Sequence, residues 1–190
     1  MINNFSEYLE RLVKISRISE TDFLNVTDLL FEAVNRGSTI WIIGNGGSAS
    51  TADHFETDLS FVKATFELTK VRAHSLCSNN SLITAIANDL GYENVFSHQI
   101  KRKAKAGDVL FAISASGNST NLINAVKFAN KNEIQTISLL GFDGGELLHS
   151  SKLSILCKSE IGLYGPVEDL HLSICHALAN SLNNRLAGTA

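Results

Sequence analysis

Hydrophobic residues follow two patterns that alternate along the chain. Short, continuous apolar runs rich in β-branched residues occupy positions 39–43, 109–113 and 136–140, and weaker ones lie at 71–76 and 153–157. Such runs are typical of strands buried on both faces of a sheet, and the intervening stretches have apolar residues at helical spacing. Strands that alternate with helices predict parallel βαβ units. The pattern therefore predicts a doubly wound α/β sandwich with a five-stranded parallel sheet.

Two further helices are expected before the first strand. Phe5, Leu9 and Leu12 recur at helical spacing, and Ser19 followed by acidic residues is a helix start signal. Only one proline, Pro166, occurs, and no linker or repeat is visible, so we expect one structural domain with N-terminal helices at 1–37 and the α/β unit at 38–190. Between and after the strands, we expect helices over 48–59, 81–87, 92–103, 120–130, 146–150 and 167–186.

Composition narrows the function classes. The 190 residues are 44% hydrophobic and 18% charged, which is unlike a disordered chain, and a net charge of −3 argues against a general nucleic-acid binder. No apolar run approaches the ~20 residues of a membrane span, and the polar start is unlike a signal peptide.

Cys77, Cys157 and Cys175 lack CxxC spacing, which argues against a disulfide framework or zinc knuckle. We therefore expect a cytoplasmic protein.

Two loops that follow strands have the composition of phosphate sites. Gly44–Ser48 is rich in glycine, and its Ser48 is suited to cap the next helix. Ser114–Thr120 combines hydroxyls, a glycine and a helix start, so backbone amides and hydroxyls can bind an anion without lysine. The alternative is a pair of ordinary strand-to-helix turns. Neither loop matches GxGxxG or GxxxxGK[ST], so we expect a sugar phosphate and no nucleotide.

Histidines and carboxylates recur at helical spacing on two predicted helices. His54 and Asp58 are four residues apart, while Glu168 and His176 are eight apart on the last helix, so each pair shares a helix face. Two histidines and two carboxylates suit a divalent metal such as zinc, and equally a carboxylate and a histidine suit acid–base catalysis. We expect the remaining histidines to be structural or exposed: His74, His98, His149 and His171.

Five segments of the chain form a recognisable set of motifs: GNGGSxxxxxHF at 44–55, AIANDLGYENVFSHQ at 85–99, GDVLFAISASGNSTN at 107–121, LLGFDGG at 139–145 and EDLHLSICH at 168–176. Together they resemble the sugar-isomerase (SIS) domain proteins, and among these the subgroup that isomerises sedoheptulose 7-phosphate. The resemblance covers almost the whole chain, and the joint occurrence of its motifs is highly specific.

The resemblance implies a flavodoxin- or Rossmann-like SIS domain in a homotetramer, with the N-terminal helices at its centre. The implied reaction interconverts sedoheptulose 7-phosphate and D-glycero-D-manno-heptose 7-phosphate, towards bacterial surface heptose and lipopolysaccharide. Asp58 would be the base and His176 the acid–base partner. One divalent metal per subunit, zinc in the family, would be held by His54, Asp58, Glu168 and His176. The implied substrate-binding residues are Asn45, Gly46, Gly47, Ser48, Asp58, Asn88, Asp89, Ser114, Ala115, Ser116, Ser119 and Glu168.

The chain departs from the family pattern at several site positions. Asp58 stands where the family has glutamate, which shortens the base by roughly 1.5 Å, and Glu168 stands where it has glutamine. Gly165–Pro166 replaces an Asp–Arg pair, and the nearest match to a family basic residue is Lys63. Two other functions are therefore compatible with the sequence: isomerisation of another sugar phosphate, or non-catalytic sugar-phosphate sensing.

Overall fold

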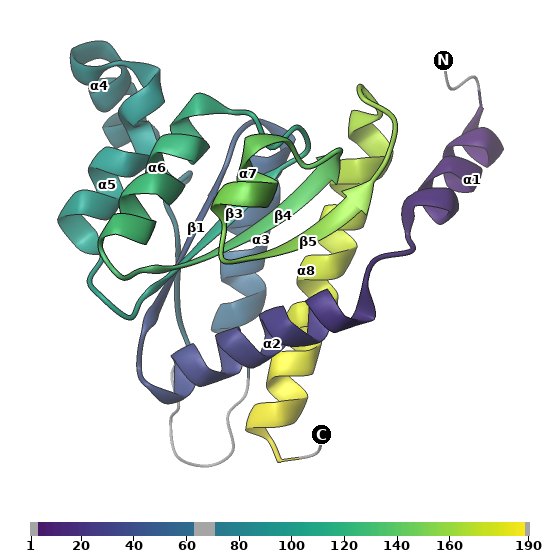
Figure 1. Cartoon of the computed structure of the whole chain (residues 1–190), viewed down its shortest axis with the longest axis horizontal. Helices are drawn as coiled ribbons and strands as arrows, with labels where there is room; N and C mark the ends of the chain where they lie inside the picture. Colours follow the sequence, from purple (N-terminus) through teal and green to yellow (C-terminus); the bar gives the residue numbers. More distant parts are fainter. Residues whose placement is uncertain (1–3, 63–70, 189–190) are drawn as a thin grey trace.

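The sheet of the computed structural model has five parallel strands, as the hydrophobic pattern predicts (Figure 1). The structure describes residues 4–62 and 71–188. The strands lie in the order β2-β1-β3-β4-β5. The second strand thus lies on one side of β1 and the later strands on the other, which makes the boundary between β1 and β3 the switch point of the sheet. Their bounds are β1 Thr39–Gly44, β2 Arg72–Ser75, β3 Val109–Ser114, β4 Gln135–Phe142 and β5 Leu153–Lys158.

Helices cover both faces of this sheet. In Figure 1, α3 and α8 lie behind the strands, while α5, α6 and α7 lie in front, and α2 crosses the end of the sheet against α8 and β5. The buried strands thus have apolar cover on both sides, which explains their continuous hydrophobic runs. The helices are α1 Phe5–Ile15, α2 Glu20–Asn35, α3 Gly47–Ser60, α4 Asn80–Leu90, the 3₁₀ turn η1 Tyr92–Asn94, α5 Val95–Lys103, α6 Thr120–Lys131, α7 Gly145–Ser150 and α8 Tyr164–Leu186.

Three predicted helices differ clearly in their bounds from the structure, and one of them, predicted over 81–87, spans Asn80–Leu90. The last helix begins at Tyr164 and not at residue 167, because Pro166 is compatible with a first turn, where its missing N–H has no intrahelical acceptor. The predicted helix 92–103 is divided into η1 and α5. No helix in the described ranges is both long and apolar enough to cross a bilayer.

The two N-terminal helices form as expected but differ in their packing. Ser19 caps α2 by accepting a hydrogen bond from the Asp22 amide at 3.2 Å. Helix α1 lies away from the sheet, against α8 (Figure 1). Its outer face exposes Phe5, Leu9 and Val13, which recur every four residues. An amphipathic helix with an exposed apolar stripe has an unpartnered face.

A buried carboxylate joins β1 to the start of β3. Asp108 is 1% exposed and accepts hydrogen bonds from the Trp41 indole and the Thr39 amide, both at 3.0 Å. These bonds offset the cost of burying its charge. The pairing of β1 with β3 places Gly44 opposite Ile113, so both strands end at the same level.

Candidate active site

The two loops predicted to bind phosphate lie side by side. They follow β1 and β3, the neighbouring strands between which the chain reverses direction across the sheet. Ligands of open α/β sheets bind at the carboxyl ends of strands at such a switch point. The strand order is a property of the tertiary structure, and it brings together two loops that are about seventy residues apart in the chain.

A cavity of about 150 Å³ lies between these loops and α8. Seven predicted substrate-binding residues line it: Asn45, Ser48, Ser114, Ala115, Ser116, Ser119 and Glu168. The lining also includes Ile113 and Tyr164, and none of its described residues is lysine or arginine. An anion in this cavity would therefore depend on hydroxyl and amide donors.

The amino ends of α3 and α6 supply such donors. Neither helix has a side-chain N-cap in the described structure, so amides of the first turn remain available at the cavity. The expectation that Ser48 caps α3 was wrong. The N-cap is Gly46, with φ +54°, and Ser48 lies one residue inside the helix. A positive φ suits glycine. Because Gly46 and not Ser48 is the N-cap, the Ser48 side chain is free to line the cavity.

A second cluster lies farther along α3. His54 and Asp58 on α3 meet His176 on α8, and one ligand atom of each lies within 4.8 Å of the others. The Nε2 atoms of the two histidines are 3.0 Å apart, and each is 3.5 Å from an Asp58 carboxylate oxygen. The His54 and His176 side chains are 49% and 46% exposed, so solvent and ligands can reach the cluster.

The donor atoms of this cluster fit a divalent metal. Two imidazole nitrogens and a carboxylate oxygen are a frequent ligand set of catalytic zinc, which keeps a further position open. Asp58 Oδ2 is buried and accepts no hydrogen bond from the described residues, although His176 Nε2 lies 3.5 Å away. A buried carboxylate oxygen that accepts no hydrogen bond is costly, and a bound cation would lower that cost.

The chain is similar to a family model and to known phosphoheptose isomerases. The SIS-domain family model matches residues 3–141. Phosphoheptose isomerase of Aliarcobacter butzleri is 34% identical, over 98% of this chain and 97% of that protein. The solved phosphoheptose isomerase of Neisseria gonorrhoeae is 30% identical and superposes with a TM-score of 0.84, over 95% of each chain.

The chain belongs to the SIS-domain phosphoheptose isomerases. A probable phosphoheptose isomerase of Thermoplasma acidophilum, 35% identical over 85% of this chain and 87% of that protein, extends the similarity to an archaeon. The predicted family and fold are thus confirmed, including the five-stranded parallel sheet and the two leading helices.

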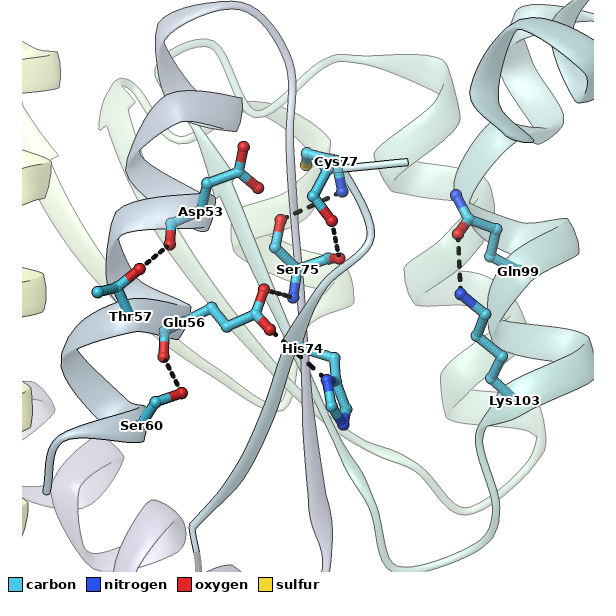
Figure 2. A network of polar contacts seen from close by, with 10 residues as sticks. Asp53, Glu56, Thr57, Ser60, His74, Ser75, Cys77, Gln99 and Lys103 are labelled. Carbon is cyan, nitrogen blue, oxygen red and sulfur yellow. Dashed lines mark hydrogen bonds and ion pairs between the residues drawn. The ribbon is translucent and has the colours of Figure 1, made fainter. Parts of the chain in front are cut away.

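In this phosphoheptose isomerase chain, α3 is fixed to the edge of the sheet by the face opposite His54 and Asp58. Figure 2 shows Glu56, between His54 and Asp58 in sequence, reaching β2. One Glu56 oxygen accepts a hydrogen bond from the Ser75 amide at 2.8 Å, and the other is 3.6 Å from His74 Nδ1. His74 therefore has a structural ion-pair partner. The contact holds α3 in place while its other face carries the cluster.

Glu168 lines the cavity between the two loops and is not one of the residues whose ligand atoms converge at the second cluster. Its carboxylate lies against Gly47, where an added Cβ would be 2.3 Å from Oε2. The atoms that converge within the described residues are those of His54, Asp58 and His176 only. Glu168 as a fourth metal ligand stays a prediction.

Other predicted residues lie outside both clusters. Asn88 and Asp89 are exposed at the end of α4, where Asn88 donates to Asp89 at 2.8 Å. Their contact with sugar hydroxyls stays a prediction, and Lys63 lies outside the described residues. Of the other histidines, His149 is exposed, His98 is partly buried and His171 is completely buried.

Four residues at or near the cavity were missed by the site prediction. Tyr164 and Ile113 line it directly, and Asn121 and Tyr92 form hydrogen bonds with Asn45. Asn121 directly follows the serine loop, and its place in the first turn of a helix beside a phosphate loop was a usable signal. Tyr164 lies outside the predicted last helix, so the sequence pattern offered no comparable signal for it.

Proposed function

We propose that the chain interconverts sedoheptulose 7-phosphate and D-glycero-D-manno-heptose 7-phosphate, with the phosphate in the serine-lined cavity. The observation that carries this proposal is that α3 and α8 contribute residues both to the cavity and to the cluster of His54, Asp58 and His176. Helix α3 begins at Gly47, which lies against Glu168, and its next residue, Ser48, lines the cavity. His54 follows Ser48 by six residues, which is about 9 Å along the helix axis. A seven-carbon sugar phosphate anchored at one cluster can extend to the other.

The phosphate would bind without a lysine or arginine from the described lining. Ser114, Ser116 and Ser119 supply hydroxyls, and the amino ends of α3 and α6 supply partial positive charge. This arrangement favours an anion and leaves the sugar carbons directed along α3. It is consistent with the negative net charge of the whole chain.

Proton transfer would be performed at the second cluster. Moving a carbonyl between C1 and C2 requires a base that takes a carbon-bound proton and returns it to the neighbouring carbon. It also requires an acid that exchanges protons with the two sugar oxygens. Asp58 is suited to the first role, and His176, within 3.5 Å of it, is suited to the second.

We further propose one zinc ion per subunit on His54, Asp58 and His176, with Glu168 as the fourth protein ligand. When bound, the metal would stabilise negative charge that develops on the sugar oxygens. The two imidazole nitrogens and the buried Asp58 oxygen, which accepts no hydrogen bond from the described residues, support this assignment. The exposed stripe of α1 similarly supports a homotetramer with the N-terminal helices at its centre.

Turnover of sedoheptulose 7-phosphate tests the function directly. The purified chain, treated with chelator and reloaded with Zn²⁺, should form the aldose phosphate, followed by NMR of its anomeric proton. Asp58→Asn should lower the rate by about 100-fold or more, since an amide cannot accept the carbon-bound proton. The exposed His149→Gln variant is the control and should retain the parental rate.

The outcomes separate the parts of the proposal. No aldose from the zinc-loaded parent would overturn the heptose assignment. A panel of ketose and aldose phosphates would then identify another sugar or none. An Asp58→Asn variant as active as its parent would remove Asp58 as the base.

A further inference from the structure

Asn45 is held by residues from two other segments of the chain. Its carboxamide pairs with that of Asn121 in the first turn of α6, through two reciprocal hydrogen bonds of 2.9 Å. The Tyr92 hydroxyl, from η1, donates to the same Asn45 Oδ1 at 2.9 Å. Asn121 is only 3% exposed, and Asn45 is partly buried. Three separate segments therefore meet at one side-chain amide beside the serine cavity.

A backbone amide determines which way both carboxamides face. The Leu122 N–H is shared between Asn121 Oδ1 and the Ser119 carbonyl, both at 3.0 Å, and a backbone N–H can only donate. A flipped Asn121 would place its NH₂ group against this donor, so its oxygen faces Leu122 and its Nδ2 donates to Asn45 Oδ1. If Asn45 were flipped, two NH₂ groups would face each other and Tyr92 would lose its acceptor. The orientation of Asn45 thus follows from a fixed backbone donor.

This arrangement leaves Asn45 with one free hydrogen-bonding group. Its Oδ1 accepts two hydrogen bonds, from Asn121 and Tyr92, and one Nδ2 hydrogen is donated to Asn121. The second Nδ2 hydrogen has no acceptor in the described part of the chain. Since Asn45 lines the cavity, this hydrogen is available to a ligand oxygen there.

We propose that Tyr92 and Asn121 are positioning residues that lock the Asn45 carboxamide as a donor to a phosphate or sugar oxygen in the cavity. The inference rests on the proposed sugar-phosphate site, and it adds two residues that do not line that site. A donor fixed before binding loses little conformational freedom when the ligand arrives. Without the Tyr92 hydroxyl, Asn45 keeps only the Asn121 pair and can rotate more freely.

A double-mutant cycle measures whether Tyr92 acts through Asn45. Calorimetric titration with inorganic phosphate and with sedoheptulose 7-phosphate would be compared for the parent, Tyr92→Phe, Asn45→Ala and the double variant. Tyr92→Phe should weaken binding of at least one probe by about three- to ten-fold, the worth of one hydrogen bond. In the Asn45→Ala background the same substitution should change affinity by less than about 1.5-fold, because the side chain through which it acts is gone.

The chain offers a matched control for a purely structural effect. Asn124 lies on the same helix as Asn121 and donates to the Glu93 carbonyl of η1 at 3.1 Å, so it links the same two segments without contacting Asn45. Asn124→Ala should leave the affinity for both probes unchanged. Tyr92 is 53% exposed, and its replacement by phenylalanine keeps the ring, so the variant should fold.

Several results would overturn the positioning role. These are an equal loss of affinity in both backgrounds, no loss for either probe, or the same loss in Asn124→Ala. The proposed function fails separately: a chain that binds the probes with the expected coupling but forms no aldose would lose the heptose assignment and keep the positioning role.

Discussion

Asp58 is the residue to which we assign both proposed roles, metal binding and proton transfer. Its side chain is 24% exposed, lies 3.5 Å from each of two imidazoles, and carries a buried oxygen without a hydrogen-bond partner among the described residues. The same carboxylate is therefore placed to bind a cation and to accept a proton. Aspartate at this position is shorter than the glutamate implied by the family, and its close approach to both histidines shows that it still reaches the cluster.

At the residue scale, a buried histidine predicts acid sensitivity. Burial lowers the pKa of His171 from 6.5 to about 4. The unfolded chain therefore binds a proton more readily than the folded chain between these values, so stability falls as pH decreases from about 6.5 towards 4. From pH 7 to pH 5 the loss attributable to this residue should be about 2 kcal/mol. Urea unfolding at both pH values measures it.

The variant His171→Leu isolates this contribution. Its absolute stability can change through packing, but its difference in stability between pH 7 and pH 5 should be smaller than that of the parent by about 2 kcal/mol. An unchanged difference would show that other groups cause the acid sensitivity.

At the element scale, the loop after β3 is supported by the loop after β4. The Leu147 amide donates to the Gly117 carbonyl at 3.0 Å, and the Glu146 amide donates to Asn118 Oδ1 at 3.0 Å. The first turn of α7 is therefore hydrogen-bonded to the loop of residues 114–119. The conformation of the phosphate loop consequently depends on a segment that does not line the cavity.

Gly117→Ala should test this contact between loops. Gly117 has φ +64°, and an added Cβ would lie 1.9 Å from the Gly144 carbonyl oxygen, a backbone atom that cannot move independently. We expect a loss of at least about 2 kcal/mol in unfolding free energy, together with weaker phosphate binding. Gly37→Ala, at φ +70° with nothing within 4 Å of the added Cβ, should cost only about 1 kcal/mol. Equal losses in the two variants would contradict the proposed contact.

At the scale of the whole molecule, helix α1 stands apart from the sheet. It packs against α8 with one face, assisted by a 2.5 Å hydrogen bond from the Tyr8 hydroxyl to Asp169, and exposes apolar residues on the other. Asp169 directly follows Glu168, which lines the cavity, so α1 contacts the residue next to a cavity residue. Assembly through α1 would thus join the subunit contacts to the site.

Leu9→Asp should therefore disrupt the proposed tetramer. A charge in the middle of the exposed stripe would have to be desolvated between subunits, which is unfavourable. Sedimentation velocity should show smaller species for this variant, while Leu9→Met, which keeps the face apolar, should sediment like the parent. A parent chain that is monomeric at micromolar concentration would contradict the proposal itself.

Much of the site was predictable because its chemistry is local in sequence. The serines of 114–119 lie in one loop, and His54 and Asp58 lie one turn apart on one helix, so spacing alone places each set on one surface. The contact between Tyr92 and Asn45 could not be predicted in this way. Their contact joins residues far apart in the chain, and no periodicity connects them.

The sequence by itself determined the fold class, the five strands and most helix bounds, since buried parallel strands and amphipathic helices have distinct hydrophobic periods. It also singled out the two loops that line the cavity. Only the tertiary structure decided the strand order and the hydrogen bonds that Tyr92 and Asn121 make to Asn45. The convergence of His176 on His54 and Asp58 was implied by the family resemblance, but local spacing does not contain it. These features depend on which helices pack together and on which strand ends are neighbours, and local propensity contains no information about either.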